Sequence, residues 1–381
     1  MEGQSETGPI YTKRGSMKKR ADSAQNRRTV MLASLSNKAV LTKARAMYGS
    51  RLTAEDYREL THKYSVGEAV AYLKNETHYK DALESISESD MHRNHIEATL
   101  KKDLYLQYIR LVHYSNSGNG ADNFYDYVWM RLEIEQILAC LRLLTAGHME
   151  EFITQMPLYA EGKLRFDLHE MAQVRDYDQL LKAVRRTRYY AILESFQPKE
   201  GKRLDYTSCE VAMRSYYYTM VDRFIDKEFH GSVKKELQAM FDAMVELKNI
   251  CTVYRLKKYY KMPPAQIKEH LISYTSRIPL SYYDGLMNAD VSDDGDRILE
   301  QSRFRRYMDS SEWERDGNIE NSSQRTMFRL TRQYIHFSTS PALVFAAYMF
   351  LSELEIENII DIIEGLHYKL PPEDIDSMLI L

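Results

Sequence analysis

The feature that most constrains this chain is a short motif that occurs three times at nearly equal intervals. The motif reads Glu-[Ile/Leu]-x-[Asn/Gln]-Ile and runs from Glu133 to Ile137, from Glu246 to Ile250 and from Glu355 to Ile359. The intervals, 133 to 246 and 246 to 355, are both about 110 residues. A period of this length indicates a repeated subdomain, because the turns of a solenoid are much shorter.

A second pattern recurs with the same period. It consists of a hydroxyl residue, any residue and an aromatic residue, followed by an apolar residue, an acid and a serine. The three copies begin with Thr77-His78-Tyr79, Thr187-Arg188-Tyr189 and Ser302-Arg303-Phe304. Two unrelated patterns that share one period predict three copies of a single folding unit.

The residues around the motifs predict helices. Ile356, Ile359, Ile360 and Ile363 recur at intervals of three and four, which places them on one buried helix face. Pro371-Pro372, followed by two acids, is typical of the first turn of another short helix. The segment Tyr260-Lys261-Met262-Pro263-Pro264 repeats this arrangement in the second copy. No stretch shows a convincing period of two, so we expect an all-α fold.

Composition restricts the class of protein. The chain has 381 residues, of which 44% are hydrophobic and 28% charged, as in a globular protein with ample core. The net charge of −3 provides no overall attraction for nucleic acid or an anionic membrane. Three scattered cysteines favour free thiols in a reducing compartment. Neither a membrane-spanning segment nor an apolar signal core is found, so we expect a cytoplasmic location.

The repeats predict how the chain is divided. Residues 1–35 are polar and basic and are expected to form a flexible tail. The three helical repeats are then expected at 36–150, 151–265 and 266–381. Within them, the predicted helices include 92–114, 124–144, 166–174, 177–196, 209–229, 233–260 and 324–337. Thr53, followed by Glu55-Asp56, predicts a capped helix start in the first repeat.

Motifs for chemistry are incomplete wherever they occur. His169-Glu170 begins like a zinc-protease helix, but Gln173 stands where the second histidine is needed. Residues 290–301 imitate a calcium loop and lack its final bidentate acid. Gly118-Asn119-Gly120 lacks the remainder of a phosphate-binding loop. We therefore expect no catalytic residue, no bound metal and no cofactor. The 29 tyrosines are interpreted as packing and protein-contact residues, so no nucleic-acid partner is expected.

The three motif glutamates allow two interpretations. Matching carboxylates in equivalent helices would suit a helical metal-dependent enzyme if they converged on one pocket. Because the copies are more than a hundred residues apart, we favour a structural role in three separate places. Each glutamate would then be paired with an arginine or with backbone amides at a contact between helices. A generic helical-repeat scaffold remains the other alternative.

Taken together, the repeats resemble the C-type rotor protein of the bacterial and archaeal V/A-type rotary ATPases (ATP synthases), whose eukaryotic counterpart is the d-type protein of the vacuolar proton pump. The resemblance covers residue 36 to the end and is most specific over 355–379. Family members usually carry a basic residue at the positions of Arg142 and Arg255, whereas the third copy has Glu364. The basic tail is not part of the resemblance.

The resemblance implies a funnel of three pseudo-threefold-related units. It implies two partners: the membrane-embedded proteolipid (c/K) ring and the central shaft made by the D and F proteins. It also implies a non-catalytic central-stalk adaptor that transmits torque for ATP-coupled H⁺ or Na⁺ transport, at the periphery of the membrane and without spanning it. The structural landmarks carried through the following sections are Tyr79, Glu133, Ile137, Tyr189, Glu246, Ile250, Phe304, Glu355 and Ile359.

Overall fold

A computed structural model describes residues 38–87, 91–114, 123–199, 203–273, 280–288, 304 and 319–381. Every regular element in these ranges is a helix, and no strand occurs in them. The all-α fold class is therefore confirmed. The tail 1–35, the Gly118–Gly120 segment, the calcium-like stretch 290–301 and the residues Ser302 and Arg303 lie outside the described ranges.

Within the described ranges, six long helices form the framework. Their apolar positions recur with the helical period, so each presents a continuous face to its neighbours. These helices are α5 (Arg93–His113), α6 (Tyr127–Ala146), α11 (Tyr206–Glu228), α12 (Gly231–Lys258), α17 (Ile319–Phe337) and α18 (Pro341–His367). The motif glutamates lie in α6, α12 and α18.

Short helices connect the long ones. Residues 38–48 are helical, followed by α2 (Ala54–Thr61), α3 (Val66–Glu76) and α4 (Lys80–Leu83). The middle of the chain contains η2 (Phe124–Asp126), η3 (Met149–Glu151), α7 (Phe152–Gln155), η4 (Leu158–Ala160), α8 (Leu168–Ala172), α9 (Tyr177–Ala183) and α10 (Tyr190–Ser195). The last third contains α13 (Pro264–Glu269), η5 (Leu280–Tyr283), α14 (Asp284–Asn288) and α19 (Pro372–Met378).

Local residues explain several helix ends. Thr53 caps α2 as predicted, and its hydroxyl and the Asp56 carboxylate form a reciprocal capping box. Pro264 and Pro372 each stand in the first turn of their helix, as the Pro-Pro pairs predict. Shortly after α12 and α18, a lysine adopts the left-handed region of backbone conformation. These residues are Lys261, at φ 51°, and Lys369, at φ 56°. Gly147, at φ 78°, is also in the left-handed region and caps the C-terminal end of α6.

Two predicted helix boundaries are wrong. The segment 166–174 contains only the shorter α8, and 177–196 is divided into α9 and α10. The division falls at Thr187, whose hydroxyl donates to the carbonyl of Val184 at 2.7 Å and accepts from the amide of Tyr189 at 3.2 Å. Local bonds of this kind compete with helix continuation, which the apolar period alone does not reveal.

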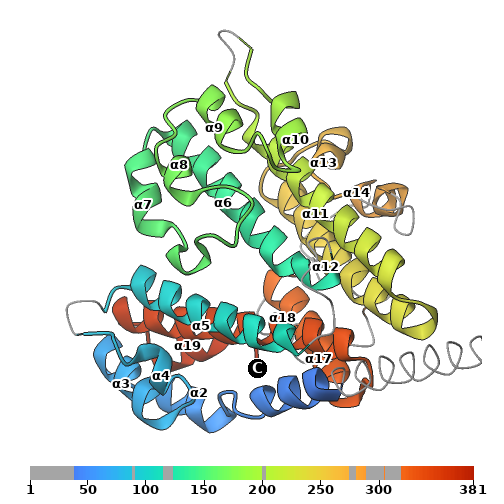
Figure 1. Ribbon diagram of the computed structural model, residues 1–381. Coiled ribbons are helices and arrows are strands. Elements are labelled where there is room, and N and C mark those ends of the chain that lie inside the picture. The colour runs from blue at the N-terminus through green and yellow to red at the C-terminus, as the bar shows by residue number, and fades with distance from the viewer. Residues whose placement is uncertain are drawn as a thin grey trace, which may run out of the picture.

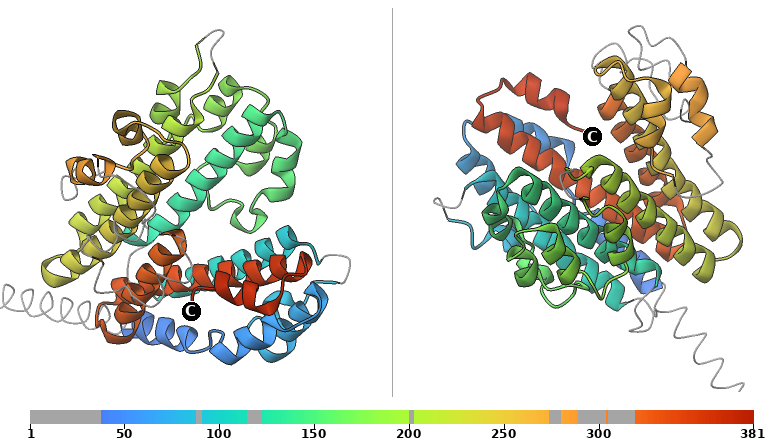
Figure 2. Two further views of the ribbon diagram at one scale, coloured as in Figure 1. Left: turned by 180° about the vertical axis from the view of Figure 1, so that it is seen from behind. Right: turned by 90° about the horizontal axis from the view of Figure 1, so that it is seen from above.

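The two ends of the chain lie together. Figure 1 shows the N-terminal helices α2 to α5 in blue and cyan beside the C-terminal helices α17 to α19 in red. The helices α6 to α10 form a second group in green, and α11 to α14 a third in yellow and gold. Contacts of α18 with α2, α3 and α5, and of α19 with α2, hold the two ends together. Figure 2 shows the same association of the chain ends from two further directions.

Buried apolar side chains follow the long helices through all three groups. α18 is the most buried of them, since most of its residues from Ala342 to Leu366 are inaccessible to solvent. Ile137, Ile250 and Ile359, which end the three motif copies, are all buried. Among the helices of the described ranges, none is both long and apolar enough to cross a bilayer.

Candidate functional site

The three motif glutamates are almost completely buried. Their exposed fractions are 1% for Glu133, 2% for Glu246 and 1% for Glu355. A carboxylate in such a position is costly unless hydrogen-bond donors or cations surround it. The partners of these side chains therefore reveal what the repeated motif does.

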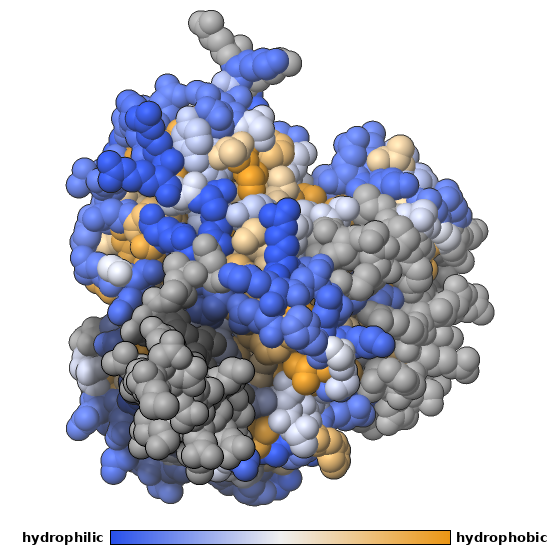
Figure 3. All heavy atoms as spheres, turned by 45° about the vertical axis from the view of Figure 1, so that its right-hand side comes forward, coloured by the Kyte–Doolittle hydropathy of each residue, from blue (hydrophilic) through white to orange (hydrophobic). Residues whose placement is uncertain are grey.

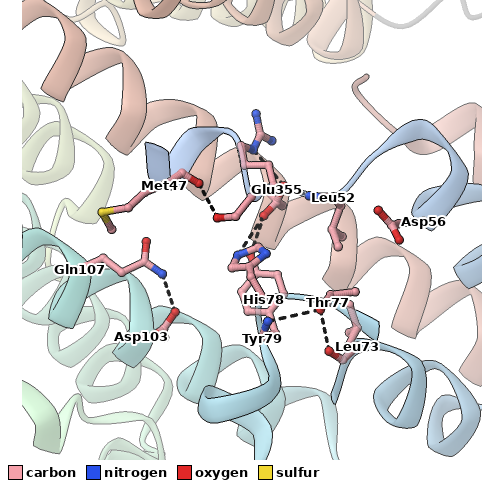
Figure 4. A network of polar contacts seen from close by, with 12 residues as sticks. Met47, Leu52, Asp56, Leu73, Thr77, His78, Tyr79, Asp103, Gln107 and Glu355 are labelled. Atoms are coloured by element: carbon pink, nitrogen blue, oxygen red, sulfur yellow. Dashed lines mark hydrogen bonds and ion pairs between the residues drawn. The ribbon is translucent and has the colours of Figure 1, made fainter. Parts of the chain in front are cut away.

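Glu355 on α18 is held by the N-terminal part of the chain. One carboxylate oxygen, Oε1, accepts from the hydroxyl of Tyr79 at 2.9 Å. The other, Oε2, accepts from the guanidinium Nε of Arg51 at 2.9 Å and from the backbone amide of Leu52 at 3.0 Å. His78 adds its Nε2 at 3.6 Å from Oε1. Figure 4 shows His78 and Tyr79 of the N-terminal segment beside the carboxylate of Glu355.

Glu133 on α6 has a similar but smaller set of partners. The hydroxyl of Tyr189 donates to Oε2 at 2.5 Å, and the backbone amide of Arg165 donates to Oε1 at 2.7 Å. Unlike Glu355, Glu133 has no ion pair among the described residues, although the charges of Arg165 and Arg188 act to lower its pKa. Burial raises the pKa of the Glu133 carboxyl, and the bonds from Tyr189 and Arg165 only partly oppose this effect.

Tyr79 and Tyr189 each follow a turn of the same kind, stabilised by the hydroxyl of a threonine two residues earlier. In the first copy, the hydroxyl of Thr77 donates to the carbonyl of Leu73 at 2.6 Å and accepts from the amide of Tyr79 at 3.3 Å. Thr187 makes comparable bonds beside Tyr189. In both copies the hydroxyl residue lies in the turn between two helices, and the aromatic residue two positions later is buried in the interior. The second sequence pattern is thus a turn that delivers a tyrosine to a buried carboxylate.

The third pair differs in chemistry. Glu246 and Phe304 are both buried, and Phe304 belongs to the same apolar cluster as Ile250. Phenylalanine has no hydroxyl, so it cannot make the bond that Tyr79 and Tyr189 make.

The pairing follows an ordered pattern along the chain. The glutamate of the first copy, Glu133, receives the tyrosine of the second copy, Tyr189. The glutamate of the third copy, Glu355, receives the tyrosine of the first copy, Tyr79. Each of these two bonds therefore connects segments that the sequence analysis expects to belong to different repeats.

Sequence reasoning assigned no role to the asparagines in the motif. Asn358 donates its Nδ2 to the carbonyl of Ile380 at 2.8 Å and accepts from the amide of the same residue at 3.0 Å. Asn249 makes the same two bonds with Ile272, both at 2.9 Å. These asparagines fix the segment that returns after the Pro-Pro helix. The signal was present in the motif, since Asn stands three residues after Glu in both copies.

A further clamp at the chain ends was not foreseen. The guanidinium of Arg45 donates to the carbonyls of Ile335 at 2.7 Å, His336 at 3.0 Å and Ser338 at 2.7 Å. These carbonyls belong to the C-terminal end of α17 and the turn after it, where a cation is favourable. Nothing in the local sequence marks Arg45 as their partner.

The arrangement favours a structural role for the glutamates over a catalytic one. Glu133 and Glu355 have separate partner sets, and these partners include the arginine and the backbone amides that the sequence led us to expect. In the part of the chain that the structure describes, no group of three His, Cys, Asp or Glu side chains could hold a metal ion. His169 lies at the surface with Glu161 at 3.3 Å.

Comparison with known proteins identifies relatives of the chain. Residues 40–378 match the family model described as ATP synthase (C/AC39) subunit. The C protein of the A-type ATP synthase from Methanosarcina mazei is 26% identical over 61% of this chain and 62% of its own length. Proteins of the same name from Methanosarcina acetivorans and Methanosarcina barkeri are 26% and 24% identical, over 57% and 78% of this chain and 58% and 78% of their own lengths. The alignments with the first two thus span less than two thirds of those relatives.

Proposed function

Because this chain belongs to the ATP synthase (C/AC39) subunit family, we propose that it is the non-catalytic central-stalk adaptor of a V/A-type rotary ATPase. In this role it joins the proteolipid ring to the shaft formed by the D and F proteins. It transmits torque between them and so supports ATP-coupled transport of H⁺ or Na⁺. It works at the periphery of the membrane, on the cytoplasmic side.

The observation that carries this proposal is the pair of buried tyrosine–glutamate bonds, Tyr189 to Glu133 and Tyr79 to Glu355. A part that transmits torque must resist deformation where its units meet. Buried hydrogen bonds to a carboxylate are stronger and more directional than apolar contacts, because a low local dielectric increases their electrostatic energy. Carboxylates at the joints between units therefore suit a stiff adaptor.

The order of these bonds also supports a closed arrangement of three units, as the funnel requires. The repeats 36–150, 151–265 and 266–381 would then interlock, each glutamate helix receiving the aromatic turn of the following repeat. By this rule Glu246 of the second repeat faces the turn that contains Phe304. The last helix, α18, receives the first turn through Tyr79 and closes the set.

The surface is compatible with contacts made during assembly. On the face shown in Figure 3, polar side chains predominate and apolar ones form small separate patches. A protein that waits for its partners needs such a surface, because a wide apolar socket would promote aggregation. We expect the contacts with the shaft and the ring to be largely polar at their rims.

The proposal is tested first by binding. The purified chain should retain the D and F proteins in a pull-down and should bind neither DNA nor ATP. Tyr79→Phe provides a matched variant, because it removes one buried hydroxyl without touching the outer surface. We expect this variant to bind D and F when freshly folded and to lose binding at a lower temperature than the unaltered chain. Failure of the unaltered chain to retain D and F would contradict the adaptor role.

A further inference from the structure

A small polar cavity lies beside the carboxylate of Glu355, where α5, α18 and the turn that carries His78 meet. The polar residues on its wall include His78, Asp103, Gln107, Tyr348, Ser352 and Glu355. The centre of a water molecule has about 10 Å³ of free space there, close to the minimum that one water molecule needs. We call this space the Glu355 cavity.

One ring nitrogen of His78 is buried without a hydrogen-bond partner. Nε2 lies 3.6 Å from Oε1 of Glu355, whereas Nδ1, on the other side of the ring, has no partner among the described residues. The rings of His78 and Tyr79 lie 4.0 Å apart at their centroids, so packing holds the imidazole in place. Buried polar atoms are rarely left unpaired, and ordered water often supplies the missing bond.

The position of Glu355 determines what Nδ1 of His78 requires. Because Nε2 faces a carboxylate oxygen, we expect the neutral imidazole to carry its proton on Nε2. Nδ1 is then an acceptor and requires a donor. Of the tyrosine hydroxyls on the cavity wall, that of Tyr79 already donates to Glu355. That of Tyr348 donates to Oε1 of Gln107. A water molecule can supply the donor that these hydroxyls do not.

An acceptor for the second hydrogen of such a water lies on α5. Oδ2 of Asp103 accepts from Nε2 of Gln107 at 2.6 Å, and Oδ1 has no hydrogen bond from the described residues. A carboxylate offers about four acceptor positions, so Asp103 can accept a further bond. Figure 4 shows the hydrogen-bonded pair of Asp103 and Gln107 to the left of His78 and Glu355. The cavity therefore has one acceptor on the imidazole and another on α5.

The charges on the cavity wall favour a neutral occupant. The guanidinium of Arg51, which also lines the cavity, would repel a metal cation. The carboxylates of Asp103 and Glu355 would repel an anion. The free space excludes a molecule much larger than water. Water is neutral and small, and it both donates and accepts hydrogen bonds, so it meets all these conditions.

We propose that the Glu355 cavity is a binding site for one ordered water molecule, which donates to Nδ1 of His78 and to the carboxylate of Asp103. This water extends the contacts of Glu355 through the imidazole to the pair of Asp103 and Gln107, so that α18 and the N-terminal turn are also linked to α5. When the imidazole is protonated, the same water accepts from Nδ1 instead. The inference concerns the isolated chain and does not depend on the adaptor role.

A crystal structure of the full chain, at a resolution that shows ordered water, tests the site directly. We expect a water molecule about 2.7 to 3.2 Å from Nδ1 of His78 and at a similar distance from a carboxylate oxygen of Asp103. An empty cavity would overturn the proposal, and so would a protein group bonded to Nδ1. An occupant with about six oxygen ligands at about 2.0 to 2.6 Å would be a metal ion and would also overturn it.

A second measurement follows the water in solution by nuclear magnetic resonance. In the full chain with isotope-labelled histidine, magnetisation should pass from water to the ring hydrogens of His78, with the sign that a long-lived contact gives. Asp103→Leu replaces the acceptor on α5 with an apolar side chain of similar size, and this transfer should fall at least threefold. The control Asp81→Leu changes an exposed acid of α4 and should leave the transfer unchanged.

Equal transfer in the two variants would overturn the proposal. The same spectra show which ring nitrogen of His78 carries the proton. A neutral imidazole protonated on Nδ1 would also overturn the proposal, because the water would then have no acceptor on the ring.

Discussion

The joint between Tyr189 and Glu133 and the joint between Tyr79 and Glu355 use the same donor and acceptor in different settings. The first connects residues 56 apart in the sequence, and the second connects residues 276 apart. Glu133 is satisfied by a tyrosine and one backbone amide, whereas Glu355 also has the guanidinium of Arg51. Of the two, the joint between the chain ends is therefore the one with full charge compensation.

This difference has a physical reason. Bringing the two ends of a chain together costs more conformational entropy than closing a short loop, although the cost grows slowly with length. At the first joint, the intervening helices α7 to α9 also keep the partners near each other. At the chain ends, α18 packs against α2, α3 and α5, and the ion pair of Arg51 with Glu355 adds to this packing. Arg45 acts in the same way at the end of α17.

The largest effect is expected when the joint at the chain ends loses its carboxylate. Glu355→Ala leaves the guanidinium of Arg51, only 13% exposed, without its partner. Breaking a buried ion pair from one side costs about 3 to 5 kcal/mol, and we expect a loss in this range on urea unfolding. Glu133→Ala should cost less, because it leaves no ion-paired cation behind. Equal losses would show that the two joints are equivalent and would remove the basis of the comparison.

A smaller effect is expected when only the hydroxyl is removed. Tyr79→Phe and Tyr189→Phe each delete one hydrogen bond to a buried carboxylate, which is worth about 1.5 to 3 kcal/mol. Both variants keep the ring and therefore the packing. The Tyr189 variant should lose more, because Glu133 has fewer other donors than Glu355. Thermal unfolding of the two variants side by side measures the difference, and the reverse order would argue against our account of the partners.

The dependence of stability on pH separates the joints from two other acids of α18, Glu357 and Asp361. A carboxyl whose pKa is higher in the folded state binds more protons there, so stability falls as the pH rises from the unfolded to the folded pKa. With Glu357 at a pKa of about 7 and Asp361 at about 6, part of the stability should be lost as the pH rises from about 4 to about 7. Glu357→Gln/Asp361→Asn should flatten this slope. If the slope is unchanged in this variant, other groups cause it. The buried Glu133, whose pKa is also raised, would then be the first group to test.

The smallest effect is expected at the surface. Glu55 and Arg58 form an exposed ion pair on α2, at 2.5 Å between the charged atoms. Exposed pairs one helical turn apart contribute about 0.3 to 0.5 kcal/mol, so Arg58→Ala should change the free energy of unfolding by no more than this. This variant calibrates the urea measurements. A loss comparable with that of the tyrosine variants would show that burial does not decide the ranking.

Much of the helical framework could be predicted from sequence, because periodic apolar residues and proline-started turns act locally. The long helix around Glu355 and the short helix after Pro371 follow from such signals. The predicted helix over 177–196 failed for the opposite reason. The hydroxyl of Thr187 forms local bonds in the turn that separates α9 from α10, and a threonine alone does not show which bonds it will make.

The candidate site was predictable only in part. The repeat pointed to the three glutamates, and general reasoning about buried acids pointed to arginine and amide partners. The tyrosines appeared in the second pattern, but nothing in either pattern connected Tyr79 with Glu355 across most of the chain. Contacts between distant segments, such as Arg45 with Ile335, depend on the complete fold. The division into repeats and the closed arrangement of three units remain predictions.

The most direct test of the central claim is a transport measurement on the assembled ATPase. The complex is reconstituted into vesicles with and without this chain, and ATP hydrolysis and ATP-driven ion uptake are followed together. If the chain couples the shaft to the ring, its omission should abolish ion uptake while the catalytic head continues to hydrolyse ATP, and adding the chain back should restore uptake. Ion uptake that continues unchanged without the chain would contradict the account.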